Sequence, residues 1–430
     1  MRFSIEEVCA DQLDQQFEKL DFRDEFIIPK VNGKEAIYFC GNSLGLQPKK
    51  SRQYFNETFD KWGDQAVEGH FTEPDPWMNY HKQFTKTSAH LIGALPEEVV
   101  IMNTLTVNLH LLLVSFYRPT KKRFKILMEG GAFPSDQYAI ESQVKFHAYR
   151  GEGKLFDPDE AIIEIFPEAG EETLKTEAII EYINKHQDEL ALVMLGGVNY
   201  YTGQFYNLNE ITQAAHHVGA LAGFDLAHTA GNIPLQLHNW QVDFAVWCTY
   251  KYINSGPGGP AGAFIHNKYA NDSTLPRFAG WWGHNEQERF KMQKGFKPMY
   301  GAEGWQVSNA PVFSMVNLKA SLEIFEKAGI ENLRKKSILL TEYLAYLIEQ
   351  INTEKNRKII KIITPDNPEE RGCQLSLVIA GYGKQLFNRI SENGVICDWR
   401  EPDVIRVAPV PLYNTFADVF KFYTILKSCL

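Results

Sequence analysis

Two polar side chains, 26 residues apart, each follow an apolar segment, and together they could serve one kind of chemistry. Asp225 closes the apolar run in "LAGFDLAH", with His228 three residues later, and Lys251 follows "DFAVWCTY". A lysine that forms a Schiff base needs a desolvated amine with a lowered pKa, and a fixed carboxylate can keep a pyridine nitrogen protonated. The pair indicates a pyridoxal phosphate (PLP) site, whereas a lone lysine at a turn is usually a solvated cation.

The segment after Lys251, "NSGPGGPAGAFI", is rich in Gly and Pro. A phosphate-binding P-loop places its Lys after the glycines and follows it with Ser or Thr, and here the order is reversed. The order excludes a P-loop. The segment instead predicts a backbone that turns sharply beside a ligand and then returns to a sheet.

Two further segments could hold the phosphate and the ring of such a cofactor. In "NTLTVNLHLLL", Thr104 or Thr106 could cap a helix that starts near Val107, whose free N–H groups would face an anion. In "GGAFPSDQY", Phe133 lies just after an apolar run, where an aromatic side chain can stack on a flat ring. Taken alone, each segment has a simpler interpretation, a capped helix and a core phenylalanine.

The elements that must position these residues alternate between short apolar runs and helical patterns from residue 66 to 314. This alternation predicts an α/β fold with a mostly parallel sheet covered by helices on both faces. Ligands of such sheets bind beyond the carboxyl ends of the strands. Asp225 and Lys251 should therefore meet in one pocket of a large domain, residues 66–314.

The pattern changes after Pro311. Residues 315–350 carry two helical patterns that break near Gly329, and short strands and helices follow to the end of the chain. We predict a smaller α+β domain over residues 315–430, with the segment 1–65 packed against it.

Composition narrows the function classes. The chain has 44 Lys and Arg against 53 Asp and Glu, a net charge of −9, and no basic tract, which argues against nucleic acid or an anionic membrane as a partner. Its six cysteines form no CxxC pair, which suits reduced intracellular thiols. The first residues lack the apolar core of a signal peptide, and no apolar run reaches the length of a membrane span. We expect a cytoplasmic protein.

A metal site is a weaker alternative. Asp225, His228 and His284 could supply ligands, but no HxxxH motif or cysteine pair supports them. We predict no metal.

Eight segments, in order and across nearly the whole chain, resemble the kynureninase family: "YFCGNSLGLQPK", "LTVNLHLL", "AFPSDQYAIESQ", "GFDLAHTAGN", "CTYKYINSGPGGPAGAFIH", "AGWWGH", "VSNAPVF" and "VIRVAPVPLYN". The resemblance implies a PLP-dependent hydrolase of fold type I that acts as a homodimer. It also implies the reaction, cleavage of L-kynurenine or 3-hydroxy-L-kynurenine to anthranilate or 3-hydroxyanthranilate plus L-alanine, in tryptophan catabolism or NAD biosynthesis.

The resemblance also implies site residues. Lys251 would be the Schiff-base lysine, Asp225 would pair with the pyridine nitrogen, and Tyr250 would lie near the phosphate and assist proton transfer. Trp281 and Asn309 would complete the site partly across the dimer interface. The full cofactor set implied is Leu105, Thr106, Phe133, Pro134, Ser135, Asp136, Asp225, His228, Tyr250, Lys251, Trp281 and Asn309.

The substrate would be held by four residues. The resemblance places Arg406 on the substrate carboxylate and Ser43, His70 and Asn309 around its aromatic ring. An arginine in the apolar run "VIRVAP" needs an anion, and an internal salt bridge is the alternative partner. The polar Ser43, His70 and Asn309 favour the hydroxylated substrate. The chain departs from some members of the family at Gly196, where they have a serine.

Two other functions stay open at this point. One is another PLP enzyme of the same fold, such as an aminotransferase or a cysteine desulfurase, although a desulfurase needs a mobile cysteine on a loop, and Cys248, Cys373 and Cys397 are expected in strands. The other is a protein of this fold that binds without catalysis.

Overall fold

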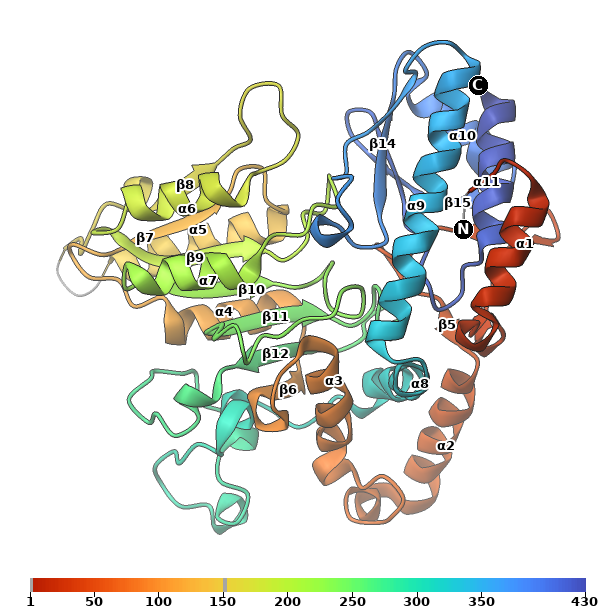
Figure 1. The fold of residues 1–430 in the computed structure, drawn as a ribbon. Coiled ribbons are helices and arrows are strands. Elements are labelled where there is room, and N and C mark those ends of the chain that lie inside the picture. Colours follow the sequence, from red (N-terminus) through yellow and green to blue (C-terminus); the bar gives the residue numbers. More distant parts are fainter. Residues whose placement is uncertain (1–2, 150–152) are drawn as a thin grey trace.

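The computed structural model describes residues 3–149 and 153–430 and contains a seven-stranded sheet at its centre (Figure 1). Neighbouring strands run parallel except around β12, which is antiparallel to both of its neighbours. The strands, in spatial order, are β6 (Val99–Met102), β12 (Ala261–Ile265), β11 (Phe244–Cys248), β10 (Leu221–Asp225), β9 (Leu190–Gly196), β7 (Lys125–Glu129) and β8 (Ile162–Ile165).

Helices cover both faces of this sheet (Figure 1). Successive strand residues point to opposite faces, so Val99 and Ile101 of β6 join one apolar core while Val100 and Met102 join another. On the second face lie α4 (Leu105–Phe116) and α5 (Pro134–Ala148); on the first lie α6 (Thr176–Lys185) and α7 (Leu208–His217). This layered arrangement confirms the predicted α/β class with a mostly parallel, helix-covered sheet.

A second, antiparallel sheet lies beside the first, in the order β13 (Ile360–Ile362), β14 (Leu375–Ile379), β17 (Val404–Val407) and β16 (Asp398–Arg400). It shares an apolar core with α9 (Ile330–Glu354), α10 (Gly383–Glu392), α11 (Phe416–Cys429) and α1 (Glu7–Gln16). Figure 1 shows both ends of the chain in this part of the molecule. Residues from the first 40 positions therefore pack with residues from the last 90.

The N-terminal segment also contacts the core on one face of the large sheet, since Phe26 and Leu46 belong to the same apolar cluster as Val99 and Ile101 of β6. Strand β4 (Ile37–Tyr38) pairs in parallel with β15 (Val395–Ile396), while α2 (Lys50–Gln65) packs along α8 (Val312–Ala328). The remaining elements are α3 (Thr85–Ile92) and the short strands β1 (Phe26–Ile27), β2 (Lys30–Val31), β3 (Lys34–Glu35) and β5 (Gln47–Pro48). The domain boundaries at residues 65 and 314 stay a prediction.

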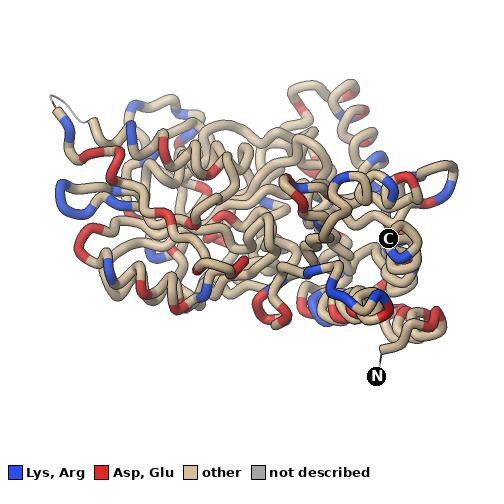
Figure 2. The backbone as a smooth tube through the Cα atoms, turned by 90° about the horizontal axis from the view of Figure 1, so that it is seen from above, with Lys and Arg blue, Asp and Glu red and all other residues tan. Residues whose placement is uncertain are grey.

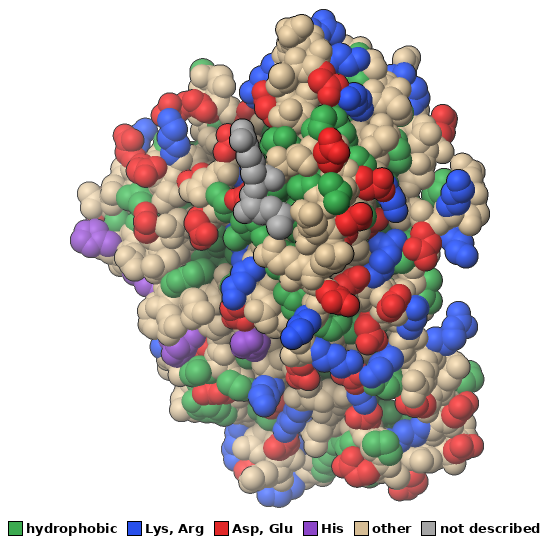
Figure 3. Space-filling model, turned by 45° about the vertical axis from the view of Figure 1, so that its right-hand side comes forward, with side chains coloured by type: hydrophobic (Ala, Val, Ile, Leu, Met, Phe, Trp, Pro, Cys, Tyr) green, Lys and Arg blue, Asp and Glu red, His purple; other side chains and the backbone are tan. Residues whose placement is uncertain are grey.

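Acidic and basic residues are spread along the described part of the chain (Figure 2), and on the face shown in Figure 3 their side chains are interspersed. Among the described residues, none of the helices combines the length and apolarity that a membrane span requires.

Candidate active site

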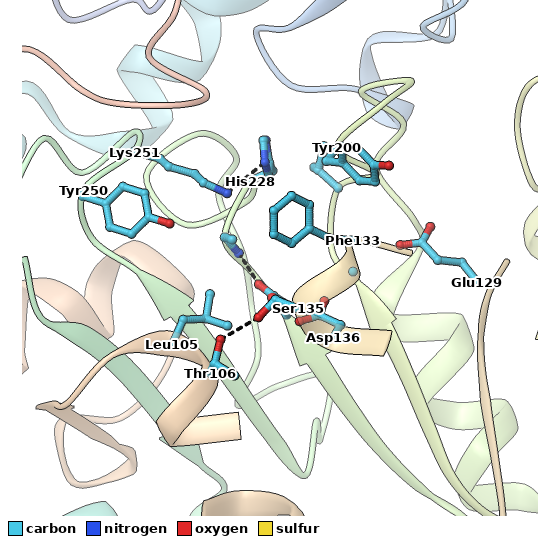
Figure 4. Close-up of a pocket in the computed structure, with 14 residues that line it drawn as sticks. Leu105, Thr106, Glu129, Phe133, Ser135, Asp136, Tyr200, His228, Tyr250 and Lys251 are labelled. Atoms are coloured by element: carbon cyan, nitrogen blue, oxygen red, sulfur yellow. Dashed lines mark hydrogen bonds between the residues drawn. The ribbon is translucent and has the colours of Figure 1, made fainter. Parts of the chain in front are cut away.

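Asp225 and Lys251 lie at the carboxyl ends of two neighbouring parallel strands, β10 and β11. Asp225 is the last residue of β10 and lies opposite Val246 of β11. Strand β11 ends at Cys248, so Lys251 lies in the turn three residues beyond the strand and not on it. The two side chains line one pocket at the carboxyl edge of the sheet (Figure 4).

Residues of five helices and strands, and of the loops next to them, surround this pocket. Figure 4 shows Tyr250, Leu105 and Thr106 on one side and Phe133, Tyr200 and Glu129 on the other, with Lys251 and His228 pointing toward each other. The complete lining is Leu105, Thr106, Glu129, Phe133, Ser135, Asp136, Gly196, Val198, Tyr200, Asp225, Ala227, His228, Tyr250 and Lys251. Nine of the predicted cofactor residues thus meet here, and Pro134 adjoins them as the first residue of α5.

Two carboxyl groups meet in the pocket. Asp225 is buried and accepts a 2.7 Å hydrogen bond from the backbone N–H of Ala227. The side chains of Asp136 and Asp225 lie close enough to shift each other's pKa, and a proton on one of them would let the two carboxyl groups share a hydrogen bond. Burial, and next the charge of Asp225, raise the pKa of Asp136 well above its usual range. Asp136 therefore carries the shared proton.

His228 lies beside the lysine in the same pocket. Its Nε2 lies 3.0 Å from Nζ of Lys251, and its Nδ1 is buried with no hydrogen-bond partner. Burial, and next the positive charge of Lys251, lower the pKa of His228 well below its ordinary value. The imidazole is therefore neutral and can accept a hydrogen bond from the lysine amine.

Helix α4 starts at Leu105, so the predicted start near Val107 is wrong by two residues. Thr104 is the N-cap residue, but its side chain makes no capping hydrogen bond, and the hydroxyl of Thr106 instead lies 2.7 Å from that of Ser135. The hydroxyls thus join the starts of α4 and α5, and the first N–H groups of α4 remain free to bind an anion.

Two aromatic residues border the lysine. Phe133 precedes α5, is 43% exposed, and has its ring centroid 5.8 Å from Nζ of Lys251. Tyr200 packs edge-to-face against it, with ring centroids 5.4 Å apart. Tyr250, next to Lys251, has its pKa raised by burial first and by Cys248 second. Its hydroxyl is therefore protonated at neutral pH.

The donor set fits PLP. Two buried polar atoms, Oδ1 of Asp136 and Nδ1 of His228, lack partners, as expected of groups arranged for a polar ring. The exposed face of Phe133 could stack on the flat ring of PLP. The start of α4, with the hydroxyls of Thr106 and Ser135, could bind its phosphate, and the amine of Lys251 could react with its aldehyde.

Arg406 does not line this pocket. It is fully buried on β17, where its Nη2 lies 2.5 Å from Oδ2 of Asp398 and its Nη1 donates to the carbonyl of Tyr200 at 2.7 Å. The internal salt bridge weighed from the sequence is therefore present. Ser43 also donates to Asp398 and lies 3.1 Å from Nη2 of Arg406.

His70, Trp281 and Asn309 meet in a second cavity and not beside Lys251. This cavity is mainly apolar, and Trp281 is 47% exposed at its edge. Ser43, expected with His70 and Asn309, lies instead at Arg406. Within the part of the chain that the structure describes, the predicted residues therefore form three separate groups.

The sequence analysis missed several residues of the main pocket. Glu129 closes β7 in the way that Asp225 closes β10, so its position at the end of "RFKILME" was a readable signal. Val198, Tyr200 and Ala227 lie in loops after the strands and carried no comparable signal.

The proposed metal alternative is not assembled. His284 does not line the pocket of Asp225 and His228, and its Nδ1 accepts a hydrogen bond from the backbone of Lys297. Among the described residues, three others could gather around an ion, namely Glu98, His238 and His266. Their facing atoms already have partners, since Glu98 accepts from His238 and Nδ1 of His266 accepts from the backbone of Lys268.

The chain is similar to known proteins along nearly its whole length. A family model described as the kynureninase C-terminal domain matches residues 333–426. A kynureninase of Flavobacterium psychrophilum is 53% identical over 97% of this chain and 96% of its own length, and one of Nematostella vectensis is 48% identical over 97% and 93%.

Solved structures show the same fold. The cysteine desulfurase CsdA of Escherichia coli superposes with a TM-score of 0.74 at 15% identity, covering 95% of this chain and 97% of its own. A cysteine desulfurase of Thermococcus onnurineus gives a TM-score of 0.72 at 17% identity, covering 91% and 94%. These structural similarities confirm the predicted fold type. The family follows from the sequence identity to the kynureninases, which is about 50% over nearly the whole chain. The chain belongs to the kynureninase family.

Proposed function

We propose that the protein hydrolyses the Cβ–Cγ bond of L-kynurenine or 3-hydroxy-L-kynurenine, giving anthranilate or 3-hydroxyanthranilate and L-alanine, with PLP as cofactor. The observation that carries the proposal is the pocket of Lys251, His228, Asp136 and Asp225, in a chain 53% identical to a kynureninase over 97% of its length.

When bound, PLP would supply an electron-accepting ring next to the substrate's α carbon. Lys251 would hold it through its aldehyde carbon, and Phe133 would cover the ring. The acid pair Asp136 and Asp225 would keep a proton on the ring nitrogen. Leu105, Thr106 and Ser135 would hold the phosphate at the start of α4.

The chain's own groups move the protons of the reaction. Cleavage requires removal of the α proton, addition of water to the γ carbonyl, and protonation of the three-carbon fragment. Nζ of Lys251 takes the α proton, since it faces the pocket and His228 accepts a hydrogen bond from it.

Tyr250 is our candidate for the proton transfers that accompany water addition. Because burial raises its pKa, its hydroxyl carries a proton in the cofactor-free protein and can donate it; a neighbouring group would have to take that proton before the oxygen could act as a base. Tyr250→Phe should then slow carbon–carbon cleavage and leave cofactor attachment intact.

We also propose that Arg406 binds the substrate's α-carboxylate, and that two subunits form the working enzyme. His70, Trp281 and Asn309 lie away from Lys251, so a second subunit is the means by which they could complete a site. An exposed aromatic row on α2, formed by Phe55, Phe59 and Trp62, offers apolar surface for such a contact. A cytoplasmic location likewise stays a prediction.

The decisive experiment mixes purified protein, PLP and L-kynurenine and measures anthranilate fluorescence. We expect a yellow protein that releases anthranilate and L-alanine in equal amounts, and a Lys251→Ala variant that does neither. A protein that binds PLP without releasing anthranilate from either substrate would contradict the proposal. The ratio of kcat/KM for the two substrates would determine which one is preferred.

Cysteine desulfurase activity is the second candidate, because the solved structures above include desulfurases. That chemistry needs a cysteine able to reach the substrate. Five of the six cysteines are buried, and Cys40 is half-buried with its pKa raised by burial to about 11. Cys373 and Cys397 lie just outside strands and not within them as predicted, but both are buried.

A further inference from the structure

Asp398 sits between two arginines. On the antiparallel pair β16–β17, Asp398 is the direct cross-strand neighbour of Arg406. Its Oδ2 lies 2.5 Å from Nη2 of Arg406 and 3.2 Å from Nη2 of Arg400, and the hydroxyl of Ser43 donates to the same oxygen. One carboxylate therefore serves two guanidinium groups.

The cluster carries one positive charge more than it can neutralise. Arg400 and Arg406 contribute two charges and Asp398 cancels one of them, while His228, whose pKa both arginines lower, is neutral. The side chain of Arg406 is 1% exposed and that of Arg400 is 37% exposed. The Nε atoms of both arginines are buried without partners. A positive cluster whose central guanidinium, that of Arg406, is buried and incompletely paired favours a second anion.

Arg406 nevertheless cannot receive a carboxylate freely in this arrangement. Its Nη1 donates to the carbonyl of Tyr200, and its Nη2 faces both Asp398 and Ser43. Bidentate binding of a carboxylate needs two parallel N–H groups on one edge of the guanidinium. Asp398 therefore has to loosen its contact with Nη2 before a substrate carboxylate can take it.

We propose that Asp398 and Arg400 are positioning residues that exchange ion pairs when substrate binds. Without substrate, Asp398 pairs with both Arg406 and Arg400. When the carboxylate of an α-amino acid binds Arg406, it replaces Asp398 there, and Asp398 remains paired with Arg400 alone. This inference rests on the proposed function, since it assigns Arg406 to the substrate carboxylate. It deepens that function by explaining how the site selects a substrate with a free α-carboxylate.

The exchange predicts opposite effects for the two residues. Loss of the charge at position 400 leaves Arg406 as the only ion-pair partner of Asp398 in this cluster. The substrate carboxylate then competes less well with Asp398 for Arg406. Loss of the charge at position 398 removes the carboxylate that competes with the substrate for Arg406. Arg400 then has no ion pair with position 398, so its substitution should have little further effect. The two substitutions must therefore be strongly non-additive.

A double-mutant cycle on the PLP-bound enzyme tests this. We expect Arg400→Gln to raise KM for L-kynurenine about tenfold with kcat within about twofold, and Arg400→Lys to restore most of the affinity. In an Asp398→Asn background, Arg400→Gln should change KM less than about twofold. Arg389→Gln, an exposed arginine on α10, is the matched control and should leave KM unchanged.

Binding measurements separate this inference from the proposed function. The affinity for L-alanine, read from the absorbance of the bound cofactor, should follow the same cycle, while kynuramine, which lacks the carboxylate, should bind all variants equally. An unchanged KM in Arg400→Gln, or an equal loss in both backgrounds, would overturn the exchange. If Asp398→Asn does not fold, the Arg400→Gln and Arg400→Lys comparison still decides. Failure of the wild-type protein to release anthranilate would instead refute the proposed function.

Discussion

Nζ of Lys251 lies 3.0 Å from Nε2 of His228, so the reactive amine has a neutral imidazole as its nearest polar neighbour. Neutrality follows from burial first and from the positive charges of Lys251, Arg406 and Arg400 next, all of which lower the pKa of His228. A neutral ring can accept a hydrogen bond from the amine, which a protonated ring could not do.

This contact predicts different outcomes for two substitutions of His228. His228→Gln keeps an acceptor at a similar distance from the backbone, whereas His228→Leu removes it. We expect kcat to fall less than about tenfold in His228→Gln and about a hundredfold in His228→Leu, because Lys251 loses its orienting partner only in the second. Anthranilate release by each PLP-bound variant measures the effect, and equal losses would show that the imidazole only fills space.

The acid pair predicts a pH dependence of stability in the cofactor-free protein. Burial first, and then Asp225, raise the pKa of Asp136, so the folded protein keeps this proton at pH values where the unfolded chain has released it. The folded protein then binds more protons than the unfolded chain. The contribution of Asp136 to the free energy of unfolding therefore falls as the pH rises above its pKa in the unfolded chain, which is near 4. The slope can reach about 1.4 kcal/mol per pH unit.

Asp136→Asn should flatten that dependence. The amide still donates to Asp225 but has no proton to lose, so urea unfolding between pH 5 and 8 should show a smaller loss of stability in the variant than in the wild type. Asp157→Asn is a suitable control, because that exposed carboxylate has its pKa lowered by hydrogen bonds. A variant with the wild-type slope would place the shared proton elsewhere.

Glu129 predicts a stability effect next to the pocket. Its carboxylate is buried and accepts hydrogen bonds from the hydroxyl of Tyr206 and from Nδ2 of Asn199 at 2.9 Å. Both donors bind the same oxygen, Oε2, so in Glu129→Gln a neutral amide oxygen replaces a carboxyl oxygen as their acceptor, and we expect a loss of about 1–3 kcal/mol in the free energy of unfolding.

Tyr206→Phe is the milder partner of this substitution. It removes one donor and leaves a ring of the same shape, so it should cost about 1–2 kcal/mol. Denaturant unfolding of both variants and of the double variant would show whether the two losses overlap, and additive losses would mean that the pair does not act as one network.

The alternation of apolar runs and helical patterns along the sequence was enough to predict the large sheet and the position of its site. Apolar runs that end in Asp225 and shortly before Lys251 indicated two parallel strands with chemistry at one edge, and the structure contains those strands. It could not predict the pairing of Arg406 with Asp398, because that contact depends on the register of β16 against β17. The place of Asn309 was equally hidden, because the packing of distant segments sets the surroundings of a loop residue.

Gly45 supports the backbone of Lys251 from a distant part of the sequence. Its N–H donates to the carbonyl of Tyr250 at 2.8 Å, and a Cβ added there would lie 2.3 Å from the carbonyl oxygen of Lys251 and 2.7 Å from Cα of Asn254. Both of these neighbours are backbone atoms, which cannot rotate away as a flexible side chain can. The "CGNSLGLQ" segment therefore needs glycine at this position so that it can pack against the lysine turn.

Gly45→Ala should displace that turn. We expect a stability loss of about 2–3 kcal/mol, typical of overpacking, together with weaker PLP attachment because Nζ of Lys251 moves relative to His228. Gly63→Ala, in the last turn of α2 with nothing near its added Cβ, is the matched control and should stabilise the protein by about 0.5–1 kcal/mol. Thermal unfolding with and without PLP measures both. A Gly45→Ala protein with wild-type stability and PLP binding would mean that the segment moves away from the turn without cost.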